Sequence, residues 1–258
     1  MHTDYGKFCW YELMTTDVPA AERFYASVVG WSTRDSGMPG MNYTLAYAGE
    51  TQAAGIAELP PEAKGMPPAW MGYVFTDRIE ETVKEIAANG GKVMRAPDDI
   101  PGVGRFAVVA DPHGAVFSLF TTEGESPAQP GMMEPGRVGW NELMAGDLDT
   151  AWDFYAKTFG WTKDAAVDMS EAGMGTYQTF AVRGGNAIGG MMTNPPGSPM
   201  PPCWGYYFVV EGLDAAQKRV TDGGGSVMMG PMEVPGGAWI INCLDPQGAY
   251  FSLVSATR

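Results

Sequence analysis

The sequence predicts an α+β protein built from four β-α-β-β-β units, which form two similar domains with curved mixed sheets and outer helices. The main observation is that the second half of the 258-residue chain repeats the first. Each half in turn contains two successions of strand, helix and three strands. The 35 glycines and 20 prolines also favour turns and short strands over long helices. Helices separate the strands too rarely for a doubly wound parallel sheet.

The repeat is clearest at the start of each half. Residues 8–31, FCWYELMTTDVPAAERFYASVVGW, align without a gap with residues 138–161, VGWNELMAGDLDTAWDFYAKTFGW. Trp10 and Trp140 lie 130 positions apart, and the separation becomes 134 from the match of Tyr43 with Tyr177 onward. One register held over many Trp, Gly and Pro positions indicates a tandem duplication.

The duplication also predicts the domain boundaries. We expect a first domain over residues 1–122 and a second over residues 137–258. The connecting residues 123–136 are rich in Gly, Pro, Ser and Glu, a composition typical of a linker.

The first unit of the first half begins with a predicted strand, Phe8–Met14, in which alternation places Trp10, Glu12 and Met14 on one face. Asp17 is a suitable N-cap for the helix that follows, and Gly30 is suited to end it. The apolar stripe of this helix consists of Ala21, Phe24, Tyr25 and Val28, and short strands are predicted over Ser32–Asp35, Asn42–Tyr47 and Ala53–Glu58.

The second unit repeats this order. We predict a strand over Trp70–Thr76 and a helix over Arg78–Asn89 with Ile79, Val83, Ile86 and Ala87 facing inward. The predicted strands that follow are Lys92–Arg95, Arg105–Val109 and Ala115–Phe120, and the turn Asp111-Pro112-His113-Gly114 joins the last two.

These features together resemble a known family. A first strand, a turn to Asp, a helix ending Phe-Tyr-x-x-x-x-Gly-Trp and a late Asp-Pro-x-Gly turn are similar to the vicinal oxygen chelate superfamily, which contains glyoxalases, bleomycin-resistance proteins and extradiol dioxygenases. The resemblance covers nearly the whole chain, twice. It implies the fold more strongly than the function, because the superfamily supports several chemistries.

The resemblance also implies where metal ligands would lie. The three ligand positions of metal-using relatives correspond to Trp10, Met71 and Ser118 in the first half, and to Trp140, Gly205 and Ser252 in the second. A divalent metal that favours His or carboxylate finds no suitable ligand among these side chains. The chain contains only two histidines, His2 and His113, in a terminal segment and a turn. We therefore expect no metal and no other cofactor.

Glu12 and Glu142 are the candidate catalytic residues, because a carboxylate in an apolar cavity can act as a general acid or base, or can receive a cationic group. The alternative is a carboxylate satisfied by structural partners. The candidate ligand-binding residues are aromatic, Met or Ser side chains on the predicted strands, with core packing as the alternative for each Trp. They are Trp10, Met14, Trp70, Met71, Tyr73 and Ser118 in the first half, and Trp140, Met144, Trp204, Tyr207 and Ser252 in the second.

The net charge of −14 and the absence of a Lys/Arg cluster argue against nucleic acid and an anionic membrane surface as partners. The N-terminus carries no apolar run, and three cysteines make no disulfide framework. We therefore expect a cytoplasmic protein with a small-molecule ligand. It is expected to be either a monomer with intramolecular domain pairing or a homodimer.

The function expected from these features is metal-free binding of an apolar or aromatic small molecule, which can be cationic, in a cup lined by Trp and Met. The alternative is a metal-independent lyase, isomerase or hydroxylase-like enzyme that uses Glu12 or Glu142 as general acid and base. A third interpretation is a regulatory or scaffolding protein without a small ligand.

Overall fold

A computed structural model of the chain describes residues 3–38, 42–63, 65–122, 133–195, 197–198 and 200–258. The elements of the first half are β1 (Phe8–Thr15), α1 (Val18–Val29), β2 (Ser32–Asp35), β3 (Tyr43–Ala48), β4 (Thr51–Glu58), η1 (Pro61–Ala63), β5 (Ala69–Phe75), α2 (Ile79–Ala88), β6 (Lys92–Ile100), β7 (Gly104–Ala110) and β8 (Val116–Thr121). Those of the second half are β9 (Val138–Ala145), α3 (Leu148–Phe159), β10 (Trp161–Asp168), η2 (Ser170–Ala172), β11 (Thr176–Val182), β12 (Ala187–Thr193), β13 (Cys203–Val209), α4 (Leu213–Asp222), β14 (Ser226–Glu233), β15 (Trp239–Leu244) and β16 (Tyr250–Ser255).

The strands form two eight-stranded mixed sheets, one from each half. Their orders are β2-β3-β4-β1-β5-β8-β7-β6 and β10-β11-β12-β9-β13-β16-β15-β14. The two orders are identical after renumbering, as a duplication requires. Within each β-α-β-β-β unit the first strand pairs in parallel with the last strand, as β1 does with β4 and β9 with β12. The outer strands of each β-α-β-β-β unit are antiparallel. The predicted α+β class and the four β-α-β-β-β units are therefore confirmed.

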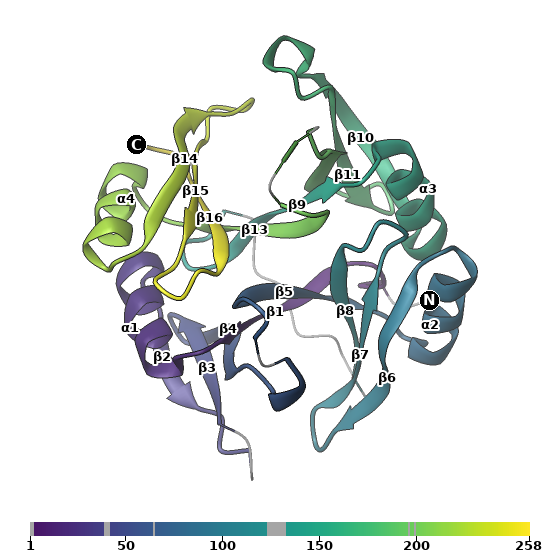
Figure 1. The fold of residues 1–258 in the computed structure, drawn as a ribbon, viewed down its shortest axis with the longest axis horizontal. Helices are drawn as coiled ribbons and strands as arrows, with labels where there is room; N and C mark the ends of the chain where they lie inside the picture. The colour runs from purple at the N-terminus through teal and green to yellow at the C-terminus, as the bar shows by residue number, and fades with distance from the viewer. Residues whose placement is uncertain (1–2, 39–41, 64, 123–132, 196, 199) are drawn as a thin grey trace. The chain divides into compact units, whose positions relative to one another are not determined.

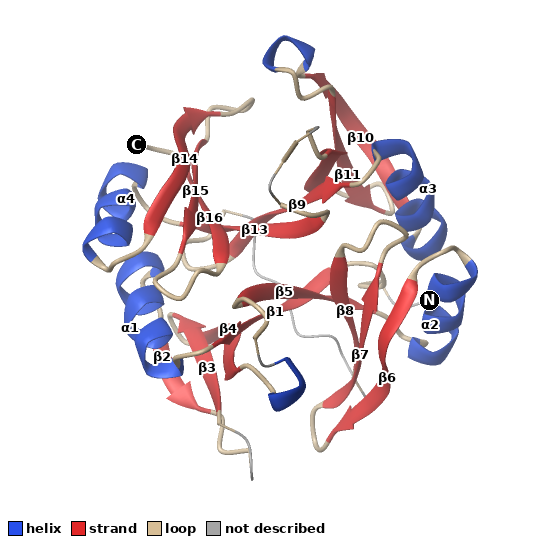
Figure 2. Ribbon diagram, viewed as in Figure 1, coloured by secondary structure: helices blue, strands red, loops and turns tan. Residues whose placement is uncertain are grey.

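The chain also divides into two compact units that differ from the two halves of the sequence. Unit 1 comprises Met1–Cys9, Gly72–Gln129 and Asn141–Trp204, and unit 2 comprises Trp10–Met71, Pro130–Trp140 and Gly205–Arg258. Unit 1 therefore contains α2 and α3, which contact each other, and unit 2 contains α1 and α4, which also do so (Figure 1). In Figure 2 each helix lies against strands of its own β-α-β-β-β unit. The predicted domain limits at residues 122 and 137 remain a prediction.

Helix α1 begins and ends where the sequence predicts. The Asp17 carboxylate accepts a hydrogen bond from the Ala20 amide at 2.9 Å, which satisfies one of the free amides of the first turn. Gly30 ends the helix with φ of 88°, a left-handed conformation that glycine adopts without a Cβ penalty. The predicted stripe of Ala21, Phe24, Tyr25 and Val28 is buried.

Helix α2 differs from its predicted pattern. Ala87 was expected to face inward, but it is exposed, and the buried residues are Ile79, Thr82 and Ile86. The prediction for Ala87 was wrong because it counted apolar residues only. Thr82 faces the core because its hydroxyl finds hydrogen-bond partners there. The Thr82 hydroxyl lies 2.8 Å from the Thr76 hydroxyl and donates to the Arg78 carbonyl.

Strand β6 is longer than the predicted Lys92–Arg95 and continues to Ile100. The longer strand contains Pro97, which cannot donate a ladder hydrogen bond. In the structure the pairing with β7 shifts register between Arg95 and Asp98, and this irregularity accommodates the proline.

The core of unit 1 is an aromatic cluster centred on Trp161. Its ring is stacked on Phe180, with centroids 4.2 Å apart, and on Tyr155, with centroids 5.0 Å apart. The indole Nε1 donates to the Gly6 carbonyl at 2.8 Å. Unit 2 has an equivalent cluster, in which Trp31 donates to the Gly136 carbonyl at 2.7 Å.

A chain of three buried polar groups recurs in the two units. In unit 1 Trp204 Nε1 donates to the Tyr155 hydroxyl at 3.0 Å, and this hydroxyl donates to Asp111 Oδ2 at 3.3 Å. In unit 2 Trp70, Tyr25 and Asp245 form the same chain with distances of 2.9 and 3.1 Å. Burial raises the pKa of both aspartates, while backbone amides of their turns act in the opposite direction. Each of these Trp–Tyr–Asp series of hydrogen bonds joins a turn of one sequence half to a helix of the other.

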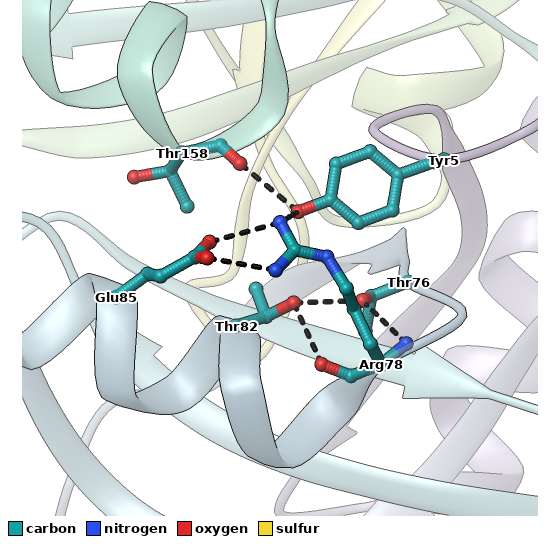
Figure 3. A network of polar contacts seen from close by, with 6 residues as sticks. All are labelled: Tyr5, Thr76, Arg78, Thr82, Glu85 and Thr158. Carbon is teal, nitrogen blue, oxygen red and sulfur yellow. Dashed lines mark hydrogen bonds and ion pairs between the residues drawn. The ribbon is translucent and has the colours of Figure 1, made fainter. Parts of the chain in front are cut away.

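A second polar network lies beside α2 in unit 1 (Figure 3). Arg78 binds Glu85 through both terminal nitrogens, at 2.7 and 3.0 Å, and also donates to the Tyr5 hydroxyl at 3.2 Å. The Tyr5 hydroxyl in turn donates to the Thr158 carbonyl on α3 at 3.0 Å. A bidentate guanidinium–carboxylate pair fixes both side chains in one geometry, and here it positions the phenol that connects the N-terminal segment to α3.

Residues 123–132 of the predicted linker lie outside the described residues. None of the helices in the described segments combines the length and the hydrophobicity needed to cross a membrane.

Candidate functional site

Unit 1 contains a carboxylate held by a tyrosine. Glu142 lies on β9 and is half-buried, and Tyr177 on β11 donates its phenolic proton to Glu142 Oε1 at 3.0 Å. Gly190 on β12 is the pairing partner of Glu142 in the sheet. A Cβ atom at Gly190 would lie 2.3–2.4 Å from three atoms of the Tyr177 ring and hydroxyl, so the phenol rests directly on the glycine backbone. The missing side chain is what allows the tyrosine to reach the carboxylate.

Unit 2 contains the same arrangement at the equivalent place. Glu12 on β1 is 9% exposed and pairs with Gly55 on β4. Tyr43 on β3 lies over that glycine, since a Cβ at Gly55 would come within 1.9 Å of its hydroxyl oxygen. Tyr43 is hydrogen-bonded to Glu12 and accepts a hydrogen bond from Trp10 Nε1 at 3.0 Å. Each unit therefore holds a Glu–Tyr–Gly site, defined by Glu12, Tyr43 and Gly55 or by Glu142, Tyr177 and Gly190.

The electrostatics of the Glu12 site keep the Tyr43 phenol protonated. Burial, and then the nearby Glu12 carboxylate, raise the pKa of Tyr43 well above its usual range. The phenol is therefore a permanent donor to the carboxylate at neutral pH. In unit 1, burial and then the Glu142 carboxylate raise the pKa of Cys203 to about 11, so this cysteine is a thiol rather than a nucleophilic thiolate.

The sequence interpretation found the two glutamates but missed Tyr43, Tyr177, Gly55 and Gly190 as site residues. The two tyrosines appeared in the repeat only as alignment markers. A usable signal was present, because a Tyr and a Gly recur on the strands that follow each Glu-bearing strand. The cross-strand register that places the phenol over the glycine could not be obtained from the repeat alone.

The other candidate residues lie on β1, β5 and β8 in the first half and on β9, β13 and β16 in the second. Met14 and Met144 are half-buried and stand two positions after Glu12 and Glu142. Tyr73 of β5 and Ser118 of β8 are a register pair in unit 1, and both are buried. The equivalent pair in unit 2 is Tyr207 and Ser252. Met71 and Trp140 are half-buried, and Trp140 packs against a cluster that includes Tyr207, Val209 and Val254.

Trp70 and Trp204 do not join the Glu–Tyr–Gly sites. They are 7% and 6% exposed, and their indoles donate to Tyr25 and Tyr155 on the helices. Trp70 also packs against Phe208, with ring centroids 4.8 Å apart. This is the core packing that the sequence allowed as the alternative for each Trp.

The positions that hold metal ligands in metal-using relatives carry neutral side chains here. Trp10 uses its indole nitrogen to bind Tyr43. Ser118 and Ser252 are fully buried neutral hydroxyls. In the described part of the chain, nowhere do three or more His, Cys, Asp or Glu side chains gather in a group that could hold a metal ion. These residues do not fit a divalent metal centre of the kind built from imidazole and carboxylate ligands.

Comparison with known proteins gives a consistent assignment. The family model for the Glyoxalase/Bleomycin resistance protein/Dioxygenase superfamily matches residues 7–119 and again residues 136–253. A protein of Mycobacterium bovis named "Putative glyoxylase CFP32" is 34% identical over 248 residues, covering 95% of this chain and 93% of its own length. The "Anthracycline biosynthesis protein DauV" of a Streptomyces species is 32% identical over 269 residues, with 96% and 93% coverage.

Solved structures share the fold at low sequence identity. The Mn(II)-bound glyoxalase from Novosphingobium aromaticivorans matches with a TM-score of 0.67 and 14% identity, over 98% of this chain and 83% of that one. The 2,3-dioxygenase LapB from Pseudomonas matches with a TM-score of 0.67 and 13% identity, over 98% and 93%. With the family model matching both halves and two relatives above 30% identity, the chain belongs to the glyoxalase/bleomycin-resistance/dioxygenase superfamily and consists of two tandem copies of its repeat.

Proposed function

We propose that this protein binds an apolar or aromatic small molecule, which can be cationic, and that it does so without a resident metal ion. The observation that carries the proposal is the Glu–Tyr–Gly site, which recurs in both units at the same register. A carboxylate oriented by a phenol is a preformed acceptor for one polar group of a ligand.

The charge of the ligand follows from the state of the tyrosine. Tyr43 stays protonated beside Glu12, and Tyr177 donates its proton to Glu142, so each site offers a carboxylate with its negative charge and hydrogen-bond acceptors. An ammonium group complements it, and a carboxylate would be repelled. The net charge of −14 also attracts cationic ligands and repels anionic ones over longer distances.

Aromatic recognition is supported by the side chains beside the glutamates. Trp10 and Trp140 precede Glu12 and Glu142 by two positions and are only half-buried, so indole surface is available for stacking or for cation–π contact. Met14 and Met144 flank the same carboxylates, and their flexible thioethers adapt to apolar ligands of varied shape. A relative at 32% identity is named for anthracycline biosynthesis, and anthracyclines are polycyclic aromatic compounds.

The proposal predicts a charge ranking for ligands of one shape. Tryptamine, 3-ethylindole and indole-3-propionate carry a positive, a neutral and a negative group on the same ring system, and isothermal titration calorimetry should rank their affinities in that order. Replacing both carboxylates, by Glu12→Gln with Glu142→Gln, should lower tryptamine affinity roughly tenfold, because a charged hydrogen bond of about 1.5–3 kcal/mol is removed. Binding of 3-ethylindole should change little.

Each single variant, Glu12→Gln or Glu142→Gln, serves as the control for the contribution of one unit. If no member of the series binds, or if the double variant keeps the preference for tryptamine, the proposal is wrong.

A second candidate function is metal-independent catalysis of the lyase or isomerase type. It is favoured by the 3.0 Å contact between Tyr177 and Glu142, since such a pair can move a proton next to a carbonyl. Turnover of the methylglyoxal–glutathione hemithioacetal by the chelator-treated protein, lost in the double Gln variant, would favour this candidate over binding alone.

A further inference from the structure

A hollow of about 500 Å³ lies at one end of strands β6, β7 and β8, in unit 1 (Figure 1). Lys92, Ala110 and Val116 form one row across these three strands, because Lys92 pairs with Ala110 and Ala110 pairs with Val116. Paired residues point to the same face of a sheet, so the three side chains line the hollow together. Its wall also includes Met94, Pro112 and His113. We call it the Lys92 hollow.

The Lys92 hollow lies on the face of the sheet that the helices do not cover. Phe117, the neighbour of Val116, points to the opposite face, where its ring centroid lies 5.7 Å from that of Tyr155 on α3. Phe117 is fully buried, whereas Val116 and Met94 are 37% and 54% exposed. A ligand can therefore reach the hollow from solvent without any change in the fold.

The second half of the sequence has larger side chains at two of these positions. Leu244 stands where the first half has Ala110, and Tyr250 where it has Val116, and the two residues pair in the same register. The Tyr250 hydroxyl accepts a hydrogen bond from the Asn242 amide of the neighbouring strand, so the ring is held across this face of the sheet. The small side chains of the first half leave the equivalent surface open.

Lys92 supplies the charge of the hollow. It is exposed and forms no salt bridge with any residue that the structure describes, whereas Arg95, three residues later, pairs with Asp98. Asp111 also borders the hollow, but it is 2% exposed, and its oxygens accept hydrogen bonds from two backbone amides and from Tyr155. The exposed charge that meets a ligand here is therefore an ammonium group.

The rest of the wall favours an alkyl group. Met94, Ala110, Pro112 and Val116 are aliphatic or thioether side chains, and the residues that line the hollow include no Phe, Tyr or Trp. Such a wall suits a flexible chain better than a flat ring, which gains most from aromatic partners. The volume lies within the range of small-molecule sites. An alkyl chain that ends in a carboxylate buries its methylene groups here and places its charge beside Lys92.

We propose that the Lys92 hollow binds an alkyl carboxylate, and that it is a second ligand site whose charge preference is opposite to that of the Glu–Tyr–Gly sites. The carboxylate pairs with the Lys92 ammonium, and the chain lies over Met94 and Val116. Because the net charge of −14 repels anions at longer distances, selection of the anion depends on this direct contact. The inference does not depend on the proposed function, since these residues belong to neither Glu–Tyr–Gly site.

The test follows isotope-labelled methionine methyl groups by NMR while octanoate is added to the protein. Met94 borders the hollow, and Met228, which is 60% exposed, is its counterpart in the second half. The Met94 signal, identified by its loss in Met94→Leu, should shift saturably, and the Met228 signal should stay in place. Octanoate should bind roughly three- to fivefold more tightly than octanol, the effect of a favourable exposed ion pair. Butanoate, with fewer methylene groups to bury, should bind at least roughly tenfold more weakly than octanoate.

Two variants with matched controls test the hollow itself. Val116→Tyr installs the side chain of the second half and should abolish the shift of Met94. Val103→Tyr makes the same exchange at a valine that is 48% exposed and does not line the hollow, and it should leave the shift intact. Lys92→Met should remove the preference for octanoate over octanol, whereas Lys157→Met, the same loss of charge on α3, should keep it.

Three results would overturn the inference. They are a Met94 signal that does not respond to octanoate, equal shifts of the Met94 and Met228 signals, and a preference for octanoate that survives in Lys92→Met. Tryptamine binding should be the same in the wild-type chain and in the Val116→Tyr and Lys92→Met variants. A failure at the hollow is therefore distinguishable from a failure of the Glu–Tyr–Gly sites.

Discussion

Replacing Trp161 by alanine is expected to lower the free energy of unfolding by about 3–5 kcal/mol, the cost of removing a large aromatic side chain from a packed core. Trp161 is 3% exposed and stacks on both Phe180 and Tyr155. Its indole nitrogen also satisfies the Gly6 carbonyl, which would lose its partner. Urea denaturation followed by circular dichroism measures the change.

The control for this substitution is Trp152→Ala on α3. Trp152 is half-buried, and its ring contacts the Lys163 ammonium at 5.2 Å. A cation–π contact near the surface contributes about 0.5–1 kcal/mol, so this variant should lose far less stability. Equal losses in the two variants would contradict the assignment of Trp161 as the centre of the core of unit 1.

Adding one methyl group at Gly190 is expected to impair ligand binding at the Glu142 site. The new Cβ would lie 2.3 Å from the Tyr177 ring, so the phenol must move away from Glu142 Oε1. Overpacking of this kind costs about 1–3 kcal/mol, and loss of a hydrogen bond to a charged group adds a similar amount to the binding free energy. In a Glu12→Gln background, which isolates the Glu142 site, Gly190→Ala should weaken tryptamine binding roughly tenfold.

A double-mutant cycle identifies the cause. In a Tyr177→Ala background there is room for the methyl group, so Gly190→Ala should change tryptamine affinity by less than about twofold. A tenfold loss in both backgrounds would mean that Gly190 acts through the strand rather than through the tyrosine.

The fold could be predicted from this sequence because its signals are local and occur twice. The N-cap Asp17, the terminating Gly30 and the inward stripe of α1 each follow from short-range chemistry, and the structure confirms them. Where the prediction failed, at Ala87 and at the end of β6, the outcome depended on contacts made by Thr82 and on a register shift opposite β7. Neither can be obtained from hydrophobic periodicity.

The candidate site could be predicted only in part, for a related reason. Alternation along one strand places Glu12 and Glu142 on a face with Trp and Met residues. The phenols that orient the carboxylates come from other strands, and their reach depends on a missing Cβ on a third strand. Trp70 and Trp204 illustrate the converse, because their hydrogen bonds to helix tyrosines assign them to the core.

We propose that a Glu–Tyr–Gly site recognises its ligand without a metal ion. The most direct test is calorimetric titration of tryptamine into protein dialysed against EDTA, repeated after addition of Mn²⁺, Zn²⁺, Ni²⁺ or Fe²⁺. We expect saturable binding that the chelator does not weaken and that none of these ions strengthens. Loss of binding on chelation, with recovery at one ion per site, would contradict the account.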